Sequence, residues 1–237
     1  MSIRVSAAMA VYNGEAYLTE QVASILSQLG SNDELVLSLD PSTDQSEQII
    51  RQFSKNDRRI VFVKGPGQGV VKNFEKAIAH TRGAYIFLAD QDDVWTQDKV
   101  SCCLDALKKD GVMAVIHDAY VTDESLHVQS QSVTGGVFHT GAFRNIVRNR
   151  YMGCCMAFKR ELLSAVLPFP ANLPMHDQWI GLLAGRTGRV AYINKPLIYY
   201  RRHGRTATGR EKSGLLQKLV WRLNITAAYW KRRKRHV

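Results

Sequence analysis

The sequence predicts an α/β protein in which a mainly parallel sheet is wrapped by helices, and two observations support this prediction. In the first half of the chain, short apolar runs alternate with longer segments whose apolar residues recur at helical spacing. Three of the apolar runs end in polar or acidic residues, at Tyr12, Asp40 and Asp90. Because the carboxyl ends of parallel strands share one edge of a sheet, these residues should meet in one ligand-binding crevice.

The elements of the first half follow one another at the lengths of strands and helices. Apolar runs predict strands over residues 5–11, 34–39, 60–63 and 84–89. Helical spacing predicts helices over 13–28 and 71–80, and a third that ends at residue 53 and begins at a capping box formed by Ser42 and Gln45. The segment "GPGQG" before residue 70 is expected to be a flexible loop.

The pattern is less regular after residue 95. A helix over 97–109 and a strand over 113–119 are predicted, followed by the polar stretch "TDESLHVQSQSVTGG", which is expected on the surface. A helix over 161–166 should end at the turn of Pro168 and Pro170, a second should begin near His176, and residues 190–193 predict a late strand. Neither an internal repeat nor a low-complexity linker interrupts the chain.

Length and charge indicate one domain followed by a basic tail. The chain has 237 residues, 45% of them hydrophobic and 22% charged, as in a soluble globular protein, and it contains no apolar run long enough for a membrane span. Residues 1–194 carry 19 Lys and Arg against 20 Asp and Glu, whereas residues 195–237 carry 13 against Glu211 alone. The N-terminus is typical of a first strand rather than of a signal peptide, so we expect a cytoplasmic protein.

The four cysteines form two adjacent pairs, Cys102–Cys103 and Cys154–Cys155. Adjacent cysteines match neither the spacing of zinc ligands nor a common disulfide framework. We expect them to be reduced and partly buried.

The stretch "FLADQDDVW" places Asp90, Asp92 and Asp93 directly after an apolar run. One alternative is a solvated turn, and Asp93 fits a cap of the next helix, but three neighbouring carboxylates need a cation or strong donors to be stable together. Few oxygen ligands suit Mg²⁺ or Mn²⁺ bridging the phosphates of a nucleotide diphosphate. No Walker A sequence is present, and "GPGQG" lacks the spacing of a dinucleotide-binding loop.

Six segments in this order carry a resemblance to a known family: "AVYNGEAYLTEQVASILSQ", "LDPSTDQS", "GVVKNFEKAIAHTRGAYIFLADQDDVW", "GCCMAFKRELL", "HDQW" and "YRRHG". Together they resemble the inverting family 2 glycosyltransferases of the GT-A fold. The forms "DQDDVW", "HDQW" and "YRRHG" look most like the bacterial rhamnosyltransferase-type members that build surface polysaccharides such as O-antigen. The resemblance spans roughly residues 5 to 205, with residues 1–110 as the nucleotide-sugar half and 111–205 as the acceptor half.

The resemblance implies a role for particular positions. Asp177 of "HDQW" falls at the catalytic base, and Asp90 and Asp92 match the D-x-D element, with Asp92 as the direct metal ligand. His203 of "YRRHG" falls near the diphosphate or metal, and Trp179 and Gly153 fall on the acceptor side. The donor-side positions are Val11, Tyr12 and Asn13, which lie along the nucleotide, Asp40 at the base, Lys72, Asn73, Asp90 and Gln91.

Two positions depart from the family pattern. Leu39-Asp40-Pro41-Ser42 stands where the family usually has Asp-Asp-Gly-Ser, which bears on base recognition. His176 replaces the usual Glu before the catalytic Asp, as in the rhamnosyltransferase-like members.

Several candidate residues have structural alternatives. Asp40 and Asp44 also suit turns, Asp177 beside Pro174 suits a helix cap, and His203 suits a surface position in a basic strip. Trp95 and Trp179 suit either the core or a face that stacks on sugars.

The implied reaction is the transfer of a hexose or deoxyhexose, with L-rhamnose from dTDP-rhamnose preferred over UDP-galactose or UDP-glucose. The metal would neutralise the leaving diphosphate while Asp177 takes the proton of the acceptor hydroxyl. Two other classes stay open: a phosphohydrolase, which usually has Thr where Val94 stands, and a non-catalytic sugar-nucleotide-binding homologue.

The tail over 206–237 has Leu215, Leu216, Leu219, Val220, Leu223 and Trp230 at helical spacing, followed by "KRRKRH". This pattern is typical of peripheral attachment to an anionic membrane surface, here the inner face of the cell membrane. It would suit a lipid-linked acceptor such as a polyprenyl-diphosphate-linked saccharide. Packing of the helix on the domain is the second interpretation, and no nucleic-acid partner is expected.

Overall fold

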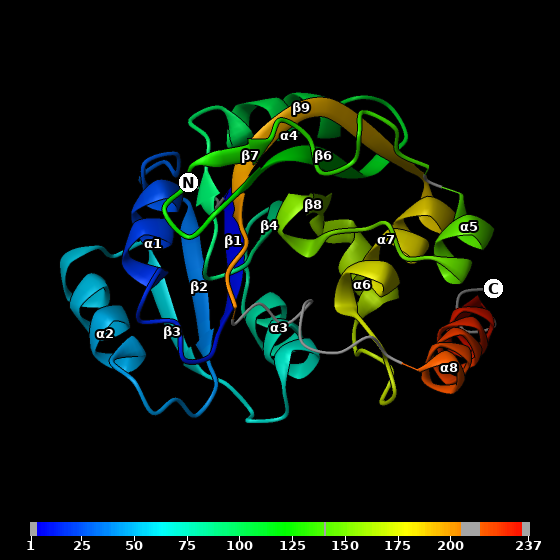
Figure 1. Cartoon of the computed structure of the whole chain (residues 1–237), viewed down its shortest axis with the longest axis horizontal. Helices are drawn as coiled ribbons and strands as arrows, with labels where there is room; N and C mark the ends of the chain where they lie inside the picture. Colours follow the sequence, from blue (N-terminus) through cyan, green and yellow to red (C-terminus); the bar gives the residue numbers. More distant parts are fainter. Residues whose placement is uncertain (1–3, 140, 205–213, 234–237) are drawn as a thin grey trace.

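The computed structural model describes residues 4–139, 141–204 and 214–233 (Figure 1). The elements alternate in the order that the sequence predicts for the first half, and the second half adds several short ones. In chain order they are β1 (Val5–Val11), α1 (Leu18–Leu26), β2 (Glu34–Leu39), α2 (Ser46–Asn56), β3 (Ile60–Lys64), α3 (Val70–Ala79), β4 (Tyr85–Ala89), β5 (Val94–Trp95), α4 (Lys99–Leu107), β6 (Val112–Thr122), β7 (Val128–Ser130), α5 (Ala142–Val147), η1 (Gly153–Cys155), β8 (Met156–Lys159), η2 (Arg160–Leu162), α6 (Leu163–Val166), α7 (His176–Thr187), β9 (Arg189–Arg201) and α8 (Leu215–Arg233).

One sheet runs through the described part of the chain. Its order is β3-β2-β1-β4-β8-β6-β9-β5, and β7 pairs with β6. The half formed by β3, β2, β1 and β4 is parallel, as predicted, so the carboxyl ends of these four strands share one edge. That edge positions the candidate site.

The second half of the sheet is mixed. β8 lies antiparallel between β4 and β6, whereas β9 runs parallel to β6 and antiparallel to β5. β9 therefore brings its end near Arg201 beside the loop that follows β4. This pairing joins the "YRRHG" segment to the acidic stretch, although about a hundred residues separate them in the chain.

The residues of β1 and β2 are buried because helices cover both faces of the sheet. Every residue of β2 is buried, and six of the seven residues of β1 are. α3 packs on β1 and β2, while α4 and α7 pack on β6 and β9. Continuous burial explains why these strands read as uninterrupted apolar runs rather than as an alternating pattern.

Two predicted helix caps are wrong. α2 begins at Ser46, and its N-cap residue Gln45 makes no side-chain cap, so Ser42 does not form a capping box. Instead the Ser42 hydroxyl donates to the Asp40 carbonyl at 2.8 Å. Asp93 does not cap a helix either, because α4 begins six residues later, at Lys99.

The four cysteines are free, as expected, and three of them are buried. The predicted surface stretch after β6 contains the short strand β7 and is tied to the sheet. Asp118 of β6 accepts hydrogen bonds from the backbone N–H groups of Val133 and Thr134 at 3.0 and 3.2 Å. The loop is therefore anchored at its base rather than loose throughout.

α8 packs on the domain through one of its faces. Ile225 is buried, Arg186 donates to the Tyr229 carbonyl at 2.9 Å, and Arg232 donates to the Leu167 carbonyl at 3.0 Å. The second half of the basic cluster "KRRKRH", from residue 234 onward, lies outside the described residues. Among the helices that are described, none combines the length and the apolar character that crossing a bilayer requires.

Candidate active site

The ends of β1 and β2 and the start of α3 are held together by backbone contacts. The Val11 carbonyl accepts the Asp40 N–H at 2.9 Å and the Asn73 side-chain amide at 3.1 Å. Asp40 is buried, and one of its carboxylate oxygens accepts the Gly67 N–H at 2.8 Å. The structure therefore brings three of the predicted donor-side residues together at one edge.

Asp40 also fixes the "GPGQG" loop, which is accordingly not simply a flexible connection. A Cβ atom at Gly65 would lie 2.4 Å from Asp40 Oδ1 and 2.6 Å from Asn73 Oδ1. Only glycine leaves room for the loop to approach these side chains so closely. Asn73 Oδ1 is buried and has no hydrogen-bond partner among the described residues, so it is available to a ligand.

Tyr12 and Asn13 lie after β1, at the same edge. The side-chain amide of Gln91 accepts the Tyr12 N–H at 2.9 Å and donates to the Tyr12 carbonyl at 3.0 Å, which joins the ends of β1 and β4. Asn13 has a positive φ of 47°, and its side chain accepts the Thr43 N–H at 2.9 Å. The Tyr12 side chain is exposed and free to lie along a ligand.

Lys72 lies in the first turn of α3 and pairs with Glu75 at 2.6 Å. The other carboxylate oxygen of Glu75 accepts the Phe169 N–H at 2.6 Å. This pairing links the donor-side helix to the segment before α7, and Lys72 is partly exposed in it.

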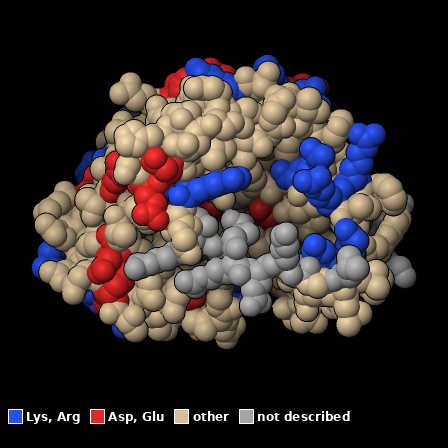
Figure 2. Space-filling view, viewed as in Figure 1, with Lys and Arg blue, Asp and Glu red and all other residues tan. Residues whose placement is uncertain are grey.

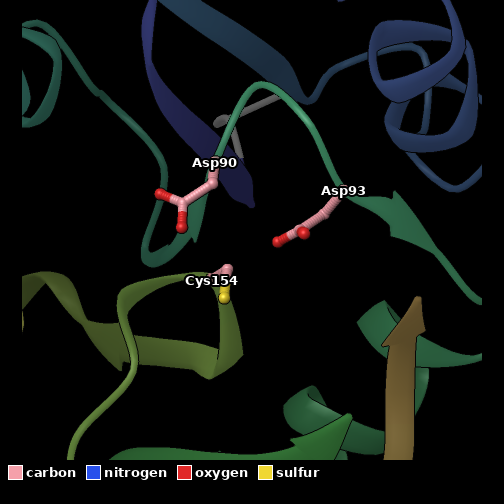
Figure 3. A group of neighbouring side chains, drawn as sticks. All are labelled: Asp90, Asp93 and Cys154. Atoms are coloured by element: carbon pink, nitrogen blue, oxygen red, sulfur yellow. The ribbon is translucent and has the colours of Figure 1, made fainter. Parts of the chain in front are cut away.

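Asp90 and Asp93 lie on either side of the turn after β4, with Cys154 of η1 close to both (Figure 3). One possible ligand atom from each lies within 4.8 Å of the others. Burial and the negative charges of Asp92 and Asp177 raise the pKa of Asp90 to about 7. Burial and the charges of Asp90 and Asp92 also raise the pKa of Asp93, so the pair holds protons at a pH where exposed carboxyls are ionised.

Asp92 faces the other predicted metal residue. One Asp92 carboxylate oxygen lies 2.8 Å from His203 Nε2, and both side chains are largely buried. One carboxylate and one imidazole so placed suit Mn²⁺ or Mg²⁺ with water and phosphate oxygens as the remaining ligands. A cation would also relieve the repulsion between carboxylates that raises the pKa values of Asp90 and Asp93. The acidic turn and His203 therefore fit the expected metal.

Arg201 organises this side of the crevice, although the sequence analysis gave it no role. Its backbone N–H donates to Asp93 Oδ1 at 3.1 Å, and its guanidinium donates to the Asp92 carbonyl at 2.8 Å and to Glu20 at 2.5 Å. The guanidinium also lies over the ring of Tyr17. The adjacency of "YRRHG" to the acidic stretch is a consequence of sheet pairing, which the motif alone does not reveal.

Asp177 lies in the first turn of α7, where it is 5% exposed. Its carboxylate accepts hydrogen bonds from the Asn149 side chain at 3.0 Å and from the Gln178 N–H at 2.5 Å, and a further one from the Gly153 N–H. Burial outweighs these bonds and raises the pKa of Asp177 to about 6. Such a carboxyl is ionised at neutral pH but is a stronger base than an exposed one.

His176 directly precedes Asp177, and its side chain is buried in the core. Its ring stacks on Phe74, with 3.9 Å between ring centroids, and neither ring nitrogen has a hydrogen-bond partner among the described residues. Burial lowers the pKa of His176 to about 3, so the ring is neutral. A Cβ at Gly153 would lie 2.9 Å from His176 Nε2, which explains why glycine stands there.

η1 connects the two acidic groups of the crevice. The Gly153 N–H bonds Asp177, and the Cys154 sulfur lies within 4.8 Å of carboxylate oxygens of both Asp90 and Asp93. The fully buried Lys99 donates to the Cys154 carbonyl at 2.6 Å and lies 4.2 Å from the centre of the Trp95 ring. The side chain of Lys99 therefore holds the η1 turn in place from the core side. Trp95 belongs to the core.

Trp179, predicted on the acceptor side, does not line the crevice. Its side chain is 0% exposed, and its indole N–H donates to the Val166 carbonyl at 3.0 Å. It therefore cannot stack on a sugar and belongs to the core between α6 and α7. Gly153 is buried beside the candidate base, and its contact with an acceptor stays a prediction.

The residues that sequence reasoning missed are those that hold the reactive groups. Asn149 follows a short helix and Lys99 begins another, both outside the segments that carry the resemblance, whereas Cys154 lies within "GCCMAFKRELL" but was given no role. The burial of Lys99 has no signal in the sequence, because a lysine in an amphipathic segment normally extends into solvent. Figure 2 shows an acidic side chain deep in the depression at the middle of this face, with exposed cations on either side.

The fold and the site define a transferase of the GT-A type, with a parallel first half of the sheet, an acidic turn after β4 and a carboxylate at the start of α7. The profile described as "Glycosyl transferase family 2" matches residues 6–167, which is more than half of the chain. The chain belongs to glycosyltransferase family 2.

Three relatives are similar over most of this chain. An uncharacterized glycosyltransferase of Nostoc sp. is 26% identical over 85% of the chain, which spans 66% of that relative. The putative teichuronic acid biosynthesis glycosyltransferase TuaG of Bacillus subtilis is 25% identical, with 92% of this chain and 89% of the relative covered. The dTDP-rhamnosyl transferase RfbG of Shigella flexneri is 27% identical, with 95% and 81% covered.

Solved structures share the fold. The TarS 1–349 structure of S. aureus in complex with UDP-GlcNAc has a TM-score of 0.70 at 19% identity and covers 89% of this chain, which spans 62% of TarS 1–349. The mannosyltransferase PcManGT of Pyrobaculum calidifontis, in complex with GDP-Man and Mn²⁺, has a TM-score of 0.66 at 18% identity, with 100% of this chain and 76% of that chain covered.

Proposed function

We propose that this chain is an inverting, metal-dependent glycosyltransferase that moves a hexose or deoxyhexose from a nucleotide diphosphate to a hydroxyl of a saccharide acceptor. The observation that supports it is that two kinds of group lie near each other, because the charge of Asp177 is felt by Asp90 in the acidic turn that also carries Asp92. Asp92 and His203, 2.8 Å apart, suit a metal-bound diphosphate, and the buried Asp177 suits a general base.

The residues have separate tasks in this reaction. A divalent ion, Mg²⁺ or Mn²⁺, held by Asp92 and His203 beside Asp90, would supply positive charge for the departing nucleotide diphosphate. Asp177 takes the proton of the acceptor hydroxyl as that oxygen bonds to the anomeric carbon from the face opposite the leaving group. The bond from the anomeric carbon to the diphosphate oxygen breaks, and the configuration inverts.

The hydrogen bonds around Asp177 fit this task. The Asn149 amide and the Gln178 N–H hold one carboxylate oxygen in place. The pKa of about 6, raised by burial, gives a base that is ionised at neutral pH and still has appreciable proton affinity.

The donor is proposed to be dTDP-rhamnose, with UDP-galactose or UDP-glucose as the next candidates. The form of the motifs and the name of the relative RfbG, a dTDP-rhamnosyl transferase, support rhamnose. Val11, Tyr12 and Asn13 would lie along the nucleotide and Asp40 would reach the base, with Lys72, Asn73 and Gln91 on the donor side. The buried unpartnered Oδ1 of Asn73 supports a ligand at this edge.

The acceptor is proposed to be a lipid-linked saccharide, carried on a polyprenyl diphosphate, in the synthesis of a bacterial surface polysaccharide such as O-antigen. The name of the TuaG relative supports a polysaccharide pathway. The enzyme would work in the cytoplasm, attached peripherally to the inner face of the cell membrane through the basic helix α8. Gly153 would lie on the acceptor side of the base.

A sugar-nucleotide-binding homologue without turnover is the second candidate. The observation in its favour is Pro41 directly after Asp40, where the family usually has glycine. The intact Asp90, Asp92 and Asp177 favour turnover.

The first test is a thermal-shift screen against dTDP, UDP, GDP and CMP, each with and without Mn²⁺. A nucleotide at about 100 times its dissociation constant adds about 2.7 kcal/mol of stability. A manganese-dependent shift with dTDP or UDP supports the donor site and identifies the donor class, whereas no shift with any of the four contradicts it. The anomeric configuration of the product, read by NMR, then distinguishes inversion from retention, and donor binding without product favours the second candidate.

A further inference from the structure

α8 has a second apolar side, opposite the one that packs on the domain. Ile225 on the packed side is 1% exposed. Leu216, Leu219, Val220 and Leu223 recur at spacings of three and four residues, so they share one side of the helix, and they are 76%, 51%, 40% and 60% exposed. The helix thus buries one apolar side and presents another outward.

α5 continues this surface. It packs beside α8 at the same end of the molecule (Figure 1), and Arg222 of α8 donates to the Val147 carbonyl of α5 at 2.9 Å. Phe143 is 80% exposed, which is unusual for so large an apolar side chain. We call the exposed set the α5–α8 face; its members are Phe143, Val147, Leu216, Leu219, Val220 and Leu223.

The surroundings of this face are basic. Arg144, Arg148 and Arg150 are exposed on and after α5, and Lys218 and Lys231 are exposed on α8. Neither helix contains Asp or Glu. Figure 2 shows a group of Lys and Arg side chains over the part of the molecule where Figure 1 places α5. Exposed apolar residues flanked by cations match a surface of anionic headgroups over an apolar interior.

We propose that the α5–α8 face docks on an anionic lipid bilayer, with Phe143 and the leucines at the boundary of the headgroups and the cations against lipid phosphates. The charges favour a bilayer over a second copy of this chain, because a two-fold interface would bring the same cations opposite one another. The inference extends the membrane attachment proposed for α8 to α5, whose aromatic anchor the sequence pattern does not reveal.

Docking in this orientation would place the reaction next to the bilayer. Asn149 follows Arg148 directly and donates to Asp177 at 3.0 Å, so the candidate base is hydrogen-bonded to a residue two positions beyond the end of α5. A saccharide anchored in the same bilayer by a lipid would be presented on this side. This part of the inference rests on the proposed function, and it explains why a basic segment adjoins the base.

The test is flotation of the purified chain with vesicles of phosphatidylcholine alone or mixed with phosphatidylglycerol. We expect binding to the mixed vesicles, and at least about a tenfold weaker partition for Phe143→Ser and for the double variant Leu219→Ser/Leu223→Ser. Val128→Ser is the matched control, because Val128 is 41% exposed on β7, away from α5 and α8 (Figure 1). All the substituted side chains are exposed, and thermal melting confirms that each variant is folded.

Three results would overturn the proposal: no binding of the wild type to the mixed vesicles, equal binding by the variants, or a dimer that the double leucine variant converts to a monomer. The dimer would assign the face to a second copy of the chain. The nucleotide screen on the same samples separates the two proposals. A nucleotide shift without vesicle binding contradicts docking alone, and vesicle binding without any nucleotide shift contradicts the proposed function alone.

Discussion

Asp177 owes its candidate role to burial more than to its neighbours. Three donors stabilise its carboxylate, yet its pKa is raised to about 6 because the side chain is removed from water. An exposed carboxylate with the same partners would be a weaker base. The buried carboxylate of Asp177 is thus suited to accepting a proton, and its burial lowers the stability of the folded state.

Asp177→Asn is expected to lower kcat about 10²- to 10⁴-fold, because the general base is lost while the shape of the side chain is kept. The manganese-dependent nucleotide shift should remain, and the melting temperature should not fall, since a buried carboxylate is removed. In the wild type, kcat/KM should rise with pH through about 6 as the carboxyl ionises. An activity of the variant close to that of the wild type would rule out Asp177 as the base.

The buried side chain of Lys99 has a structural contact rather than a candidate catalytic role. Its ammonium group donates to the Cys154 carbonyl and lies over Trp95, and burial lowers its pKa. Replacing it leaves a buried carbonyl without its donor, which usually costs about 1–3 kcal/mol.

We therefore expect Lys99→Met to lower the free energy of unfolding by about 1–3 kcal/mol in urea titrations. Lys108→Met is the matched control, because Lys108 is exposed in the connection between α4 and β6 and pairs with the exposed Asp105. An exposed ion pair of this kind contributes little to the free energy of unfolding. Equal midpoints for the two variants would mean that the Lys99 contact contributes nothing measurable.

At the scale of elements, η1 lies between the candidate base and the acidic turn after β4. Gly153 bonds Asp177 and packs against His176 of α7 without room for a Cβ, and the Cys154 sulfur lies within 4.8 Å of carboxylate oxygens of Asp90 and Asp93. A shift of η1 would therefore move the base relative to the donor.

Gly153→Ala is expected to lower kcat by about 100-fold, because a displacement of about 1 Å at a catalytic group is enough for such a loss. The nucleotide shift should be kept, since the donor edge is formed by other elements. Gly141→Ala is the control, because a Cβ there meets nothing within 4 Å. Steady-state kinetics of both variants is the measurement, and full activity of Gly153→Ala would contradict the positioning role of the turn.

The sequence predicts the parallel half of the sheet well and the mixed half poorly, for physical reasons. β1 and β2 are continuous buried runs, and their predicted bounds agree with the structure. β5 has two residues and β7 three, too short for a periodic pattern, and β8 starts directly after a 3₁₀ turn. Their existence depends on pairing with β9 and β6, which is a long-range property.

The same division applies to the site. The residues at strand ends could be predicted because parallel topology brings them to one edge, and Val11 and Asp40 do meet there. The resemblance implied a place for His203 near the metal, and His203 does lie beside Asp92. Arg201, Asn149 and Lys99 could not, because their roles come from contacts between distant segments. Trp179 was misplaced because a tryptophan beside a motif suits both the core and a sugar-binding face, and only packing decides between them.

For the molecule as a whole, charge is separated between the crevice and the surface. Asp90 and Asp93 are held close together inside, while Arg and Lys gather around α5 and in the tail. In the folded state the Asp90–Asp93 pair retains protons that the unfolded chain has already released, because the pKa of Asp90 is about 7 against a usual 3.8. This contribution to stability is greatest below about pH 4 and is lost as the pH rises through about 7.

Stability should therefore depend on pH and metal together. Between about pH 5 and pH 8 the melting temperature of the wild type should fall relative to that of Asp90→Asn, by a difference on the order of 5 °C. Mn²⁺ binds the ionised carboxylates, so its stabilising effect should grow over the same range and disappear with EDTA or in Asp92→Asn. Asp105→Asn, at an exposed position, is the control and should follow the wild type. Parallel melting curves for the wild type and Asp90→Asn at every pH, with or without Mn²⁺, would show that the acidic pair neither retains protons nor binds the metal.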